Sequence, residues 1–270
     1  MLHAVFLAPT GELSNPKVLV EVAVAAEENG WDGVFIWDHV LRPTGEPQAI
    51  ADPWVALAAI ATATERVRIG PMVTPITRRR PIKVAREALS LDHLSDGRLT
   101  IGLGLGVDTS GELSKLGEVV DAKERGQRLD EGADLLTQLW SGERVDFEGK
   151  HFVARDVTVE PRPVQQPRIP LWFAARGQAM KPVRRAARHE GLFPVDVGAD
   201  QLAQMIEAVA HERGGLDGFD VACRPNPSLE YGDFERLGVT WALSTDRPGM
   251  TRAEALTIAA TDPSEVLEQT

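Results

Sequence analysis

The feature that most constrains the fold is an alternation of short apolar runs and longer amphipathic stretches along all 270 residues. Short apolar runs bounded by glycine or proline are typical of buried strands, whereas apolar residues that recur every three or four positions indicate helices. The predicted strands are Leu2–Leu7, Gly33–Trp37, Val67–Thr74, Leu99–Leu105, Pro170–Ala174, Leu192–Val195, Asp220–Arg224 and Val239–Leu243. The predicted helices are Lys17–Asn29, Pro53–Ala63, Pro81–Leu94, Val120–Trp140, Gln178–His189 and segments near 200–213, 230–236 and 251–260.

This strand-then-helix order predicts an α/β fold in which a parallel sheet is covered by helices. Eight such units, of roughly 33 residues each, would close it into a (β/α)8 TIM barrel. We expect residues 1–270 to form one domain of this kind. The alternative is an open doubly wound sheet, whose G-x-G-x-x-G fingerprint should follow the first strand. Here the glycine-rich segment Gly102–Gly106 reads G-x-G-x-G and lies at the fourth strand, which favours the barrel.

One segment interrupts the alternation. Residues 143–160 lie before the fifth strand, and Val145–Phe152 has the pattern of a small β-hairpin centred on Gly149. We expect it to be an insertion in the loop that leads to strand five.

Charge and cysteine content exclude several classes of protein. The chain carries 29 Lys and Arg against 40 Asp and Glu, a net charge of −11, so we expect neither nucleic acid nor a membrane surface as a partner. The only cysteine is Cys223, which rules out an intrachain disulfide and fits a reducing compartment. With no basic leader and no apolar run of roughly 20 residues, we expect a cytoplasmic location.

Barrel enzymes place their active sites at the carboxyl ends of the strands. Strand two ends at Asp38-His39, where His39 could exchange a proton or simply pack beneath a loop that Asp38 caps. Strand five ends at Ala175-Arg176-Gly177, a small-residue turn before a helix. Such a turn could hold a phosphate, although a solvated arginine at an ordinary turn is the simpler alternative.

Other candidate features are weaker. The run Arg78-Arg79-Arg80 could attract an anion or could be a solvated loop, and Gly104 and Gly106 could leave room for a flat ring or serve a tight turn. The six histidines show no pair at ligand spacing, so we expect no metal site. No G-x-S-x-G elbow is present, which argues against a serine hydrolase.

Several segments together resemble the family of bacterial-luciferase-like flavin- or deazaflavin-dependent oxidoreductases. The resemblance extends from residue 1 to about 245. The segments that carry it are Ala26–His39, Asp52-Pro53-Trp54, Thr64–Gly70, Arg78–Glu87, Leu91–Leu99, Arg125–Trp140, Phe147–Phe152 and Pro161–Pro170.

The resemblance implies a cofactor, either FMN or the 5-deazaflavin coenzyme F420, with NAD(P)H as a candidate external reductant. It places His39 against the reacting part of the ring as the catalytic residue. It also implies a non-proline cis peptide bond behind the ring, expected at Val73–Thr74, and a phosphate loop at Ala175, Arg176 and Gly177. The cofactor-binding set expected on this basis is Asp38, Val73, Thr74, Gly104, Gly106, Ala175, Arg176 and Gly177.

Two departures from the family limit what can be carried over. Bacterial luciferase has a phosphate-binding arginine near the end of strand four, and the deazaflavin-dependent sugar-phosphate dehydrogenases have a glutamate acid there. This chain has Gly104-Leu105-Gly106 instead. The expected function is therefore hydride transfer or oxygen activation on a small organic substrate, with the choice between FMN and F420 left open.

Alternative interpretations belong to different classes. One is a non-catalytic flavin-binding protein, and another is an unrelated barrel enzyme that acts on a phosphorylated metabolite. The family resemblance also implies a homodimer formed through helices two and three, and the second helix is rich in alanine. The alternative for these alanines is simple packing on the barrel.

Overall fold

The computed structural model describes residues 1–41, 48–244 and 247–268. The strands are β1 (Leu2–Leu7), β2 (Gly33–Ile36), β3 (Arg68–Pro71), β4 (Thr74–Pro75), β5 (Ile101–Gly104), β6 (Val145–Glu148), β7 (Val153–Val157), β8 (Leu171–Arg176), β9 (Gly191–Val195), β10 (Asp220–Cys223) and β11 (Trp241–Leu243). The helices are α1 (Pro16–Glu28), α2 (Pro53–Ala63), α3 (Pro81–Leu94), α4 (Ala122–Leu139), α5 (Met180–Ala186), α6 (Ala199–Arg213), α7 (Phe234–Leu237), α8 (Arg252–Ala260) and α9 (Pro263–Glu268).

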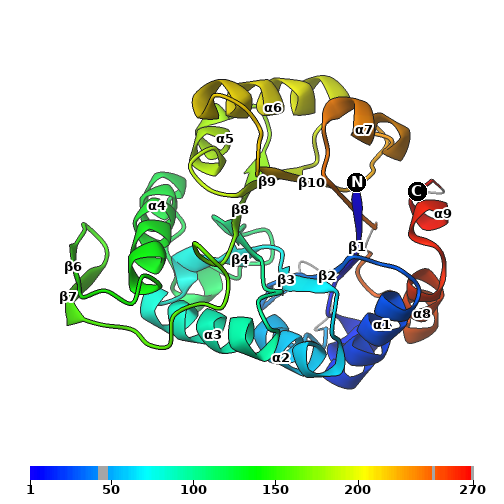
Figure 1. The fold of residues 1–270 in the computed structure, drawn as a ribbon, viewed down its shortest axis with the longest axis horizontal. Helices are drawn as coiled ribbons and strands as arrows, with labels where there is room; N and C mark the ends of the chain where they lie inside the picture. Colours follow the sequence, from blue (N-terminus) through cyan, green and yellow to red (C-terminus); the bar gives the residue numbers. More distant parts are fainter. Residues whose placement is uncertain (42–47, 245–246, 269–270) are drawn as a thin grey trace.

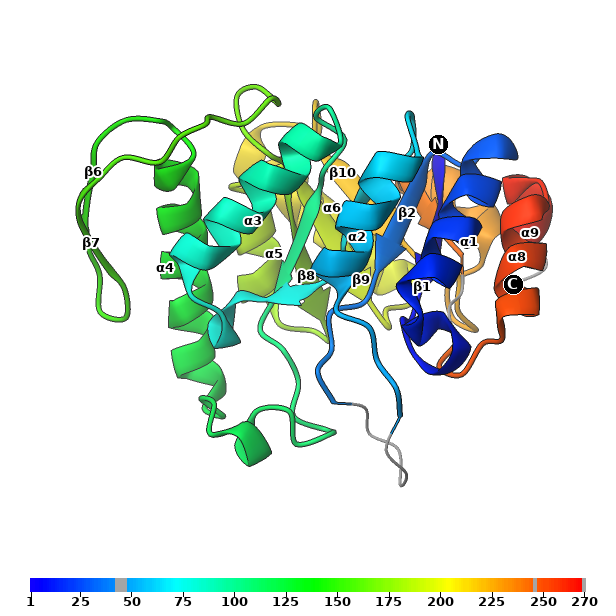
Figure 2. The ribbon, with the colours of Figure 1, turned by 90° about the horizontal axis from the view of Figure 1, so that it is seen from below.

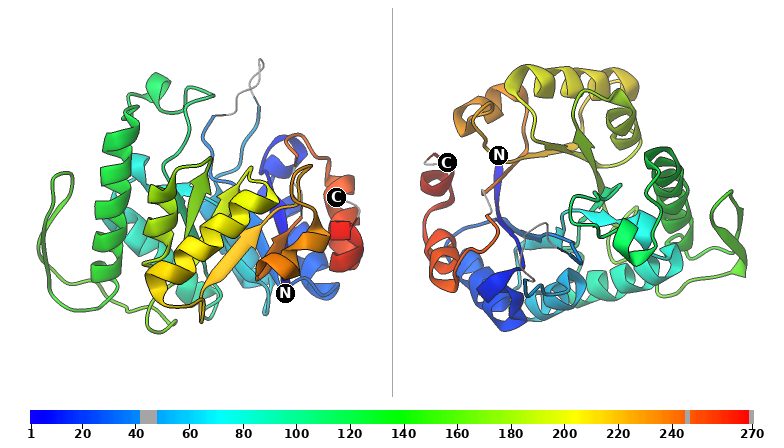
Figure 3. Two further views of the ribbon diagram at one scale, coloured as in Figure 1. Left: turned by 90° about the horizontal axis from the view of Figure 1, so that it is seen from above. Right: turned by 180° about the vertical axis from the view of Figure 1, so that it is seen from behind.

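The strands form a parallel sheet that is rolled into a barrel. Their order is β3-β2-β1-β11-β10-β9-β8-β5-β4, and the helices lie around the outside (Figure 1). The view from behind shows the same ring of strands and helices (Figure 3). The predicted α/β barrel is confirmed.

The nine strands of this sheet correspond to eight barrel strands, because β3 and β4 are two halves of one. The chain breaks after Pro71 and resumes pairing at Thr74, and a non-proline cis peptide bond joins Met72 to Val73. The sequence prediction of a cis bond at Val73–Thr74 is therefore wrong by one residue, since it treated strand three as continuous through Thr74.

The barrel closes where β3 meets β5. Ile69 forms a parallel bridge with Leu99, and a Cβ atom at Gly70 would overlap the carbonyl oxygen of Thr100. Glycine at position 70 is thus what lets the two backbones approach closely enough to complete the ring.

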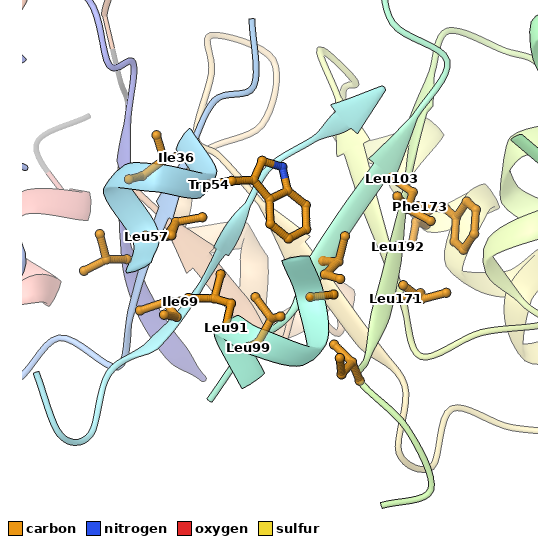
Figure 4. Close-up of a cluster of buried hydrophobic side chains, with 14 of the residues drawn as sticks. Ile36, Trp54, Leu57, Ile69, Leu91, Leu99, Leu103, Leu171, Phe173 and Leu192 are labelled. Carbon is orange, nitrogen blue, oxygen red and sulfur yellow. The ribbon is translucent and has the colours of Figure 1, made fainter. Parts of the chain in front are cut away.

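Buried side chains fill both sides of the sheet. Outside it, Trp54 and Leu57 of α2 and Leu91 of α3 pack on strand residues such as Ile36 and Ile69 (Figure 4). Inside it, the rings of Phe35, Trp172 and Trp241 lie 5.4 to 5.8 Å apart between centroids. Each large ring or aliphatic side chain removed from water contributes about 1.5–3 kcal/mol, so the barrel is a packed core with its working surface at one end.

The sequence located most elements well. Pro81–Leu94 and Pro53–Ala63 are helices with the predicted bounds, and β1 has the predicted bounds as well. The hairpin is also confirmed: β6 and β7 pair antiparallel and stand out from the body beyond α4 (Figure 1). Helix α5 is shorter than predicted, beginning at Met180 rather than Gln178 and ending at Ala186.

Two long connections rise from the carboxyl ends of the strands. One follows β2 and the other follows β5, and Figure 2 shows both extending beyond the barrel on the same side. Within the described ranges, no helix is long and apolar enough to cross a membrane.

Candidate active site

His39 and Glu112 form a hydrogen-bonded pair at the carboxyl ends of the strands. Nδ1 of His39 lies 3.0 Å from Oε1 of Glu112, and the backbone N–H of Val40 donates to Oε2 at 3.1 Å. The Glu112 side chain is fully buried, whereas that of His39 is 26% exposed. The connection after β5 therefore supplies a carboxylate to the residue that follows β2.

Glu112 is held in its ionised form. Burial acts to raise the pKa of this carboxyl, but the hydrogen bond and charge of His39, the Val40 N–H and the charge of Arg78 outweigh burial, and the pKa is lowered. An ionised carboxylate can only accept hydrogen bonds, so Nδ1 of His39 must carry the proton between the pair. In the neutral ring, Nε2 is then the nitrogen with a free lone pair.

Asp38 is buried at the centre of a polar cluster. Its carboxylate accepts hydrogen bonds from Thr74 Oγ1 at 2.8 Å and from Trp54 Nε1 at 3.3 Å. It also pairs with Arg78 at 3.0 Å and with Arg79 at 2.9 Å. Two of the predicted cofactor residues, Asp38 and Thr74, thus bind each other and fix the loop that carries His39.

The arginine run after strand three is neither a solvated loop nor an open anion site. Arg78 and Arg79 have side chains that are 6% and 19% exposed, and both are turned towards Asp38. The prediction that weighed these two roles did not anticipate a buried ion pair with the residue before His39.

An apolar floor lies between the polar groups at this end of the barrel. Trp37, Val73, Ala174 and Val195 are partly exposed and pack on the rings inside the barrel. The Trp37 ring lies 5.5 Å from that of His39 between centroids.

The glycines of strand four have a packing reason. A Cβ atom at Gly104 would come within 2.7 Å of Cγ2 of Val73, so the space beside Gly104 is occupied by that side chain. Gly106 has a φ of +73°, which favours glycine.

The arginine that the sequence lacks at strand four is supplied from α4. Nη1 of Arg125 donates to the carbonyl oxygens of Leu105 at 3.1 Å and Gly106 at 2.6 Å. Its Nε is buried and has no hydrogen-bond partner among the described residues. A donor aimed into the site in this way could bind a ligand oxygen.

The turn after β8 lies on another part of the rim. Ala175 is buried, Arg176 is 62% exposed and pairs with Asp196, and Gly177 has a φ of +67° with open space where a Cβ would stand. Because α5 begins only at Met180, its amino end does not directly follow the turn as predicted. Any phosphate held here would depend on the turn itself and on Arg176.

Sequence reasoning missed Glu112 and Arg125. Only the strand ends were searched, and Glu112 lies eight residues beyond Gly104 in a long loop, while Arg125 lies on a helix. The search of the strand ends therefore wrongly concluded that this region has no acid. Within the described ranges, no three His, Cys, Asp or Glu side chains are grouped to hold a metal ion.

Comparisons with known proteins agree with this arrangement. A sequence model described as luciferase-like monooxygenase matches residues 2–231. An F420-dependent glucose-6-phosphate dehydrogenase from Segniliparus rotundus is 30% identical over 289 residues, covering 96% of this chain and 85% of that protein. A protein of the same name from Beutenbergia cavernae is 40% identical over 165 residues, covering 60% of this chain and only about half (48%) of the relative.

Two solved structures share the fold. Monooxygenase RslO1 from Streptomyces bottropensis superposes with a TM-score of 0.79 at 21% identity, covering 100% of this chain and 99% of that one. An F420-dependent secondary alcohol dehydrogenase, in complex with an F420-acetone adduct, gives a TM-score of 0.73 at 24% identity, covering 83% of this chain and 68% of that one.

The buried pair predicts a pH-dependent loss of stability on removing the Glu112 charge. We expect Glu112→Gln to lower the free energy of unfolding at neutral pH by about 2 kcal/mol, because a hydrogen bond to an ionised group is lost. Since the folded-state pKa of Glu112 is lowered, this contribution is present above about pH 4.3, the unfolded value, and disappears as the pH falls through the folded value. Chemical denaturation of both proteins across this range measures the difference.

The matched control is Glu148→Gln, which removes an exposed carboxylate on the hairpin. We expect it to change stability by less than about 0.5 kcal/mol. An effect of Glu112→Gln no larger than this, or one that stays constant in acid, contradicts the ionised pair.

Proposed function

Because the chain belongs to the luciferase-like monooxygenase family, we propose that it is an F420-dependent oxidoreductase that oxidises a hydroxyl group of a small organic molecule. The observation that carries the proposal is the His39–Glu112 pair beside an apolar floor at the carboxyl ends of the strands. The names of two matched proteins, a glucose-6-phosphate dehydrogenase and a secondary alcohol dehydrogenase, support F420 and a hydroxyl-bearing substrate.

The residues at the rim fit a flat, phosphorylated cofactor. Val73 and Ala174 offer partly exposed apolar surface for a ring, and Gly177 borders open space. Arg125 offers the buried, unpartnered Nε described above, and Arg176 offers an exposed guanidinium. We propose that these two arginines bind the phosphate of the cofactor.

The chemistry divides between the cofactor and the chain. Bound F420 supplies a two-electron acceptor for the hydride that leaves the substrate carbon. Nε2 of His39 accepts the proton of the substrate hydroxyl, and the ionised Glu112 stabilises the imidazolium that results. Trp37 and the rest of the apolar floor limit access of water to this proton transfer.

A second candidate is an FMN-dependent monooxygenase, which the whole-length similarity to RslO1 favours. In that case NAD(P)H would be the external source of electrons, and His39 would donate or accept protons beside the oxygenated ring. The non-catalytic flavin-binding alternative rested on the absence of an acid after strand four, and Glu112 removes that ground.

Cofactor titration tests the proposal directly. We expect the protein to quench the fluorescence of F420 in a saturable way, and Arg125→Ala and Arg176→Ala each to weaken binding about tenfold, the loss of about 1.4 kcal/mol. Arg155→Ala, which removes an exposed arginine of the hairpin, is the matched control and should bind as the wild type does. Preferential binding of FMN would select the second candidate, and binding of neither cofactor contradicts both.

We further propose a homodimer formed through α2 and α3. A groove between these helices is bordered by the exposed apolar residues Val55 and Leu94 and contains both Lys83 and Glu87. Charges of both signs allow the same surface to pair with itself across a twofold axis. The alanines Ala56 and Ala61 face inward and pack on the barrel, so they do not form this surface.

Val55 provides the test of this interface, since its side chain is 65% exposed on α2. We expect the wild type to sediment as a dimer and Val55→Glu to sediment as a monomer, because an unpaired charge would be buried in the interface. Val153→Glu, on the hairpin and 54% exposed, should stay dimeric. A monomeric wild type, or a dimeric Val55→Glu protein, contradicts the proposed interface.

A reducing compartment, the cytoplasm, is the setting we propose. Cys223, the only cysteine, is buried, and burial raises the pKa of its thiol, so neither a disulfide nor a reactive thiolate is expected to form.

A further inference from the structure

The three residues that follow β2 are gripped from two sides. On one side, Arg78 donates from Nη2 to both the backbone oxygen and Oδ1 of Asp38, each at 3.0 Å. On the other side, Glu112 accepts from the His39 ring and from the Val40 N–H. The orientation of His39 therefore depends on a cation and a carboxylate that come from different connections of the barrel.

Arg78 is the more deeply buried of the two arginines on Asp38. Its side chain is 6% exposed, and its Nη1 is buried with no hydrogen-bond partner among the described residues. The hydrogen bonds to Asp38 all use Nη2, so they engage only part of the guanidinium. The remaining charge acts on Glu112, where Arg78 is one of the groups that lower the carboxyl pKa.

Arg79 has a different place in the cluster. Its Nη2 binds both carboxylate oxygens of Asp38, at 3.0 and 2.9 Å, but does not reach the backbone oxygen. Its guanidinium lies 6.0 Å from the centre of the Trp54 ring, on the side of α2. Arg79 thus completes the buried ion pair without contacting the backbone of the histidine loop.

We propose that Arg78 is a positioning residue that ties the Asp38 backbone to the Glu112 carboxylate and so keeps the proton of His39 on Nδ1. This inference rests on the proposed role of His39 as the proton acceptor. Two contacts follow from the single side chain: the grip on the Asp38 carbonyl sets where the ring stands, and the charge keeps Glu112 an acceptor only. Both leave Nε2 free on the side of the reacting group.

The consequences of losing Arg78 differ from those of losing Arg79. Without Arg78, the Asp38 carbonyl is released and Glu112 binds a proton more readily. A protonated Glu112 can donate to Nδ1, which stabilises the ring form that carries its hydrogen on Nε2. Without Arg79, Asp38 loses an ion-pair partner of the same kind, but the loop and Glu112 keep theirs.

The test is ring ¹⁵N NMR on the full-length protein with labelled histidine, with His39 assigned by its loss in His39→Gln. We expect the wild type to show the form protonated on Nδ1. We expect Arg78→Gln to lower the ratio of the Nδ1–H to the Nε2–H form about tenfold, equivalent to about 1.4 kcal/mol. Arg78→Lys, which keeps the charge, should retain more of the Nδ1–H form than Arg78→Gln. It also carries the test if Arg78→Gln does not fold.

Arg79→Gln is the matched control, because it also removes an ion pair with Asp38. We expect it to lower stability while leaving the His39 signals as in the wild type. Unchanged His39 signals in both Arg78 variants, or an equal change in Arg79→Gln, would overturn the inference. These signals require neither cofactor nor substrate, so a failure of the proposed function in the F420 and FMN titrations is distinguishable from a failure here.

Discussion

The buried carboxylate of Asp38 is the interaction on which the rest of the site depends. Burying an ionised group is tolerated only when its hydrogen-bonding capacity is satisfied, and Asp38 meets this condition with donors from several elements. Trp54 comes from α2, Thr74 from β4, and Arg78 and Arg79 from the turn before α3. The end of β2 is thereby fixed to three neighbouring parts of the barrel, and His39 follows directly.

This cluster explains why the split third strand matters for the site. Thr74 reaches Asp38 because β4 resumes pairing with β5 after the break at Met72–Val73, and the same break exposes part of Val73 at the apolar floor. Glu112 then descends from the long connection after β5 and completes the site from above. The fold supplies a rigid ring of strands, while the two connections supply the proton-transfer pair.

The sequence predicted what depends on local pattern. The runs of β1 and β2 and the helix Pro81–Leu94 follow from apolar periodicity, with Pro81 at the first helical position. Helix α5 was predicted too long because its basic and apolar residues continue the pattern past Ala186, where the helix ends. His39 was found because it adjoins a strand end. Glu112 and Arg125 were not, because their distance along the chain from the site gives no local signal, and only tertiary packing brings them to it.

The central claim is that His39 transfers the proton while a bound cofactor carries the hydride. The most direct measurement is single-turnover reduction of F420 by the wild type and by His39→Ala, with glucose-6-phosphate and isopropanol as trial substrates and with cofactor binding measured on the same samples. We predict that His39→Ala binds F420 as the wild type does, but reduces it at least about 100-fold more slowly, the low end of general acid–base catalysis. We also predict that added imidazole partly restores the rate. Equal rates in the two proteins at equal cofactor occupancy would contradict the account.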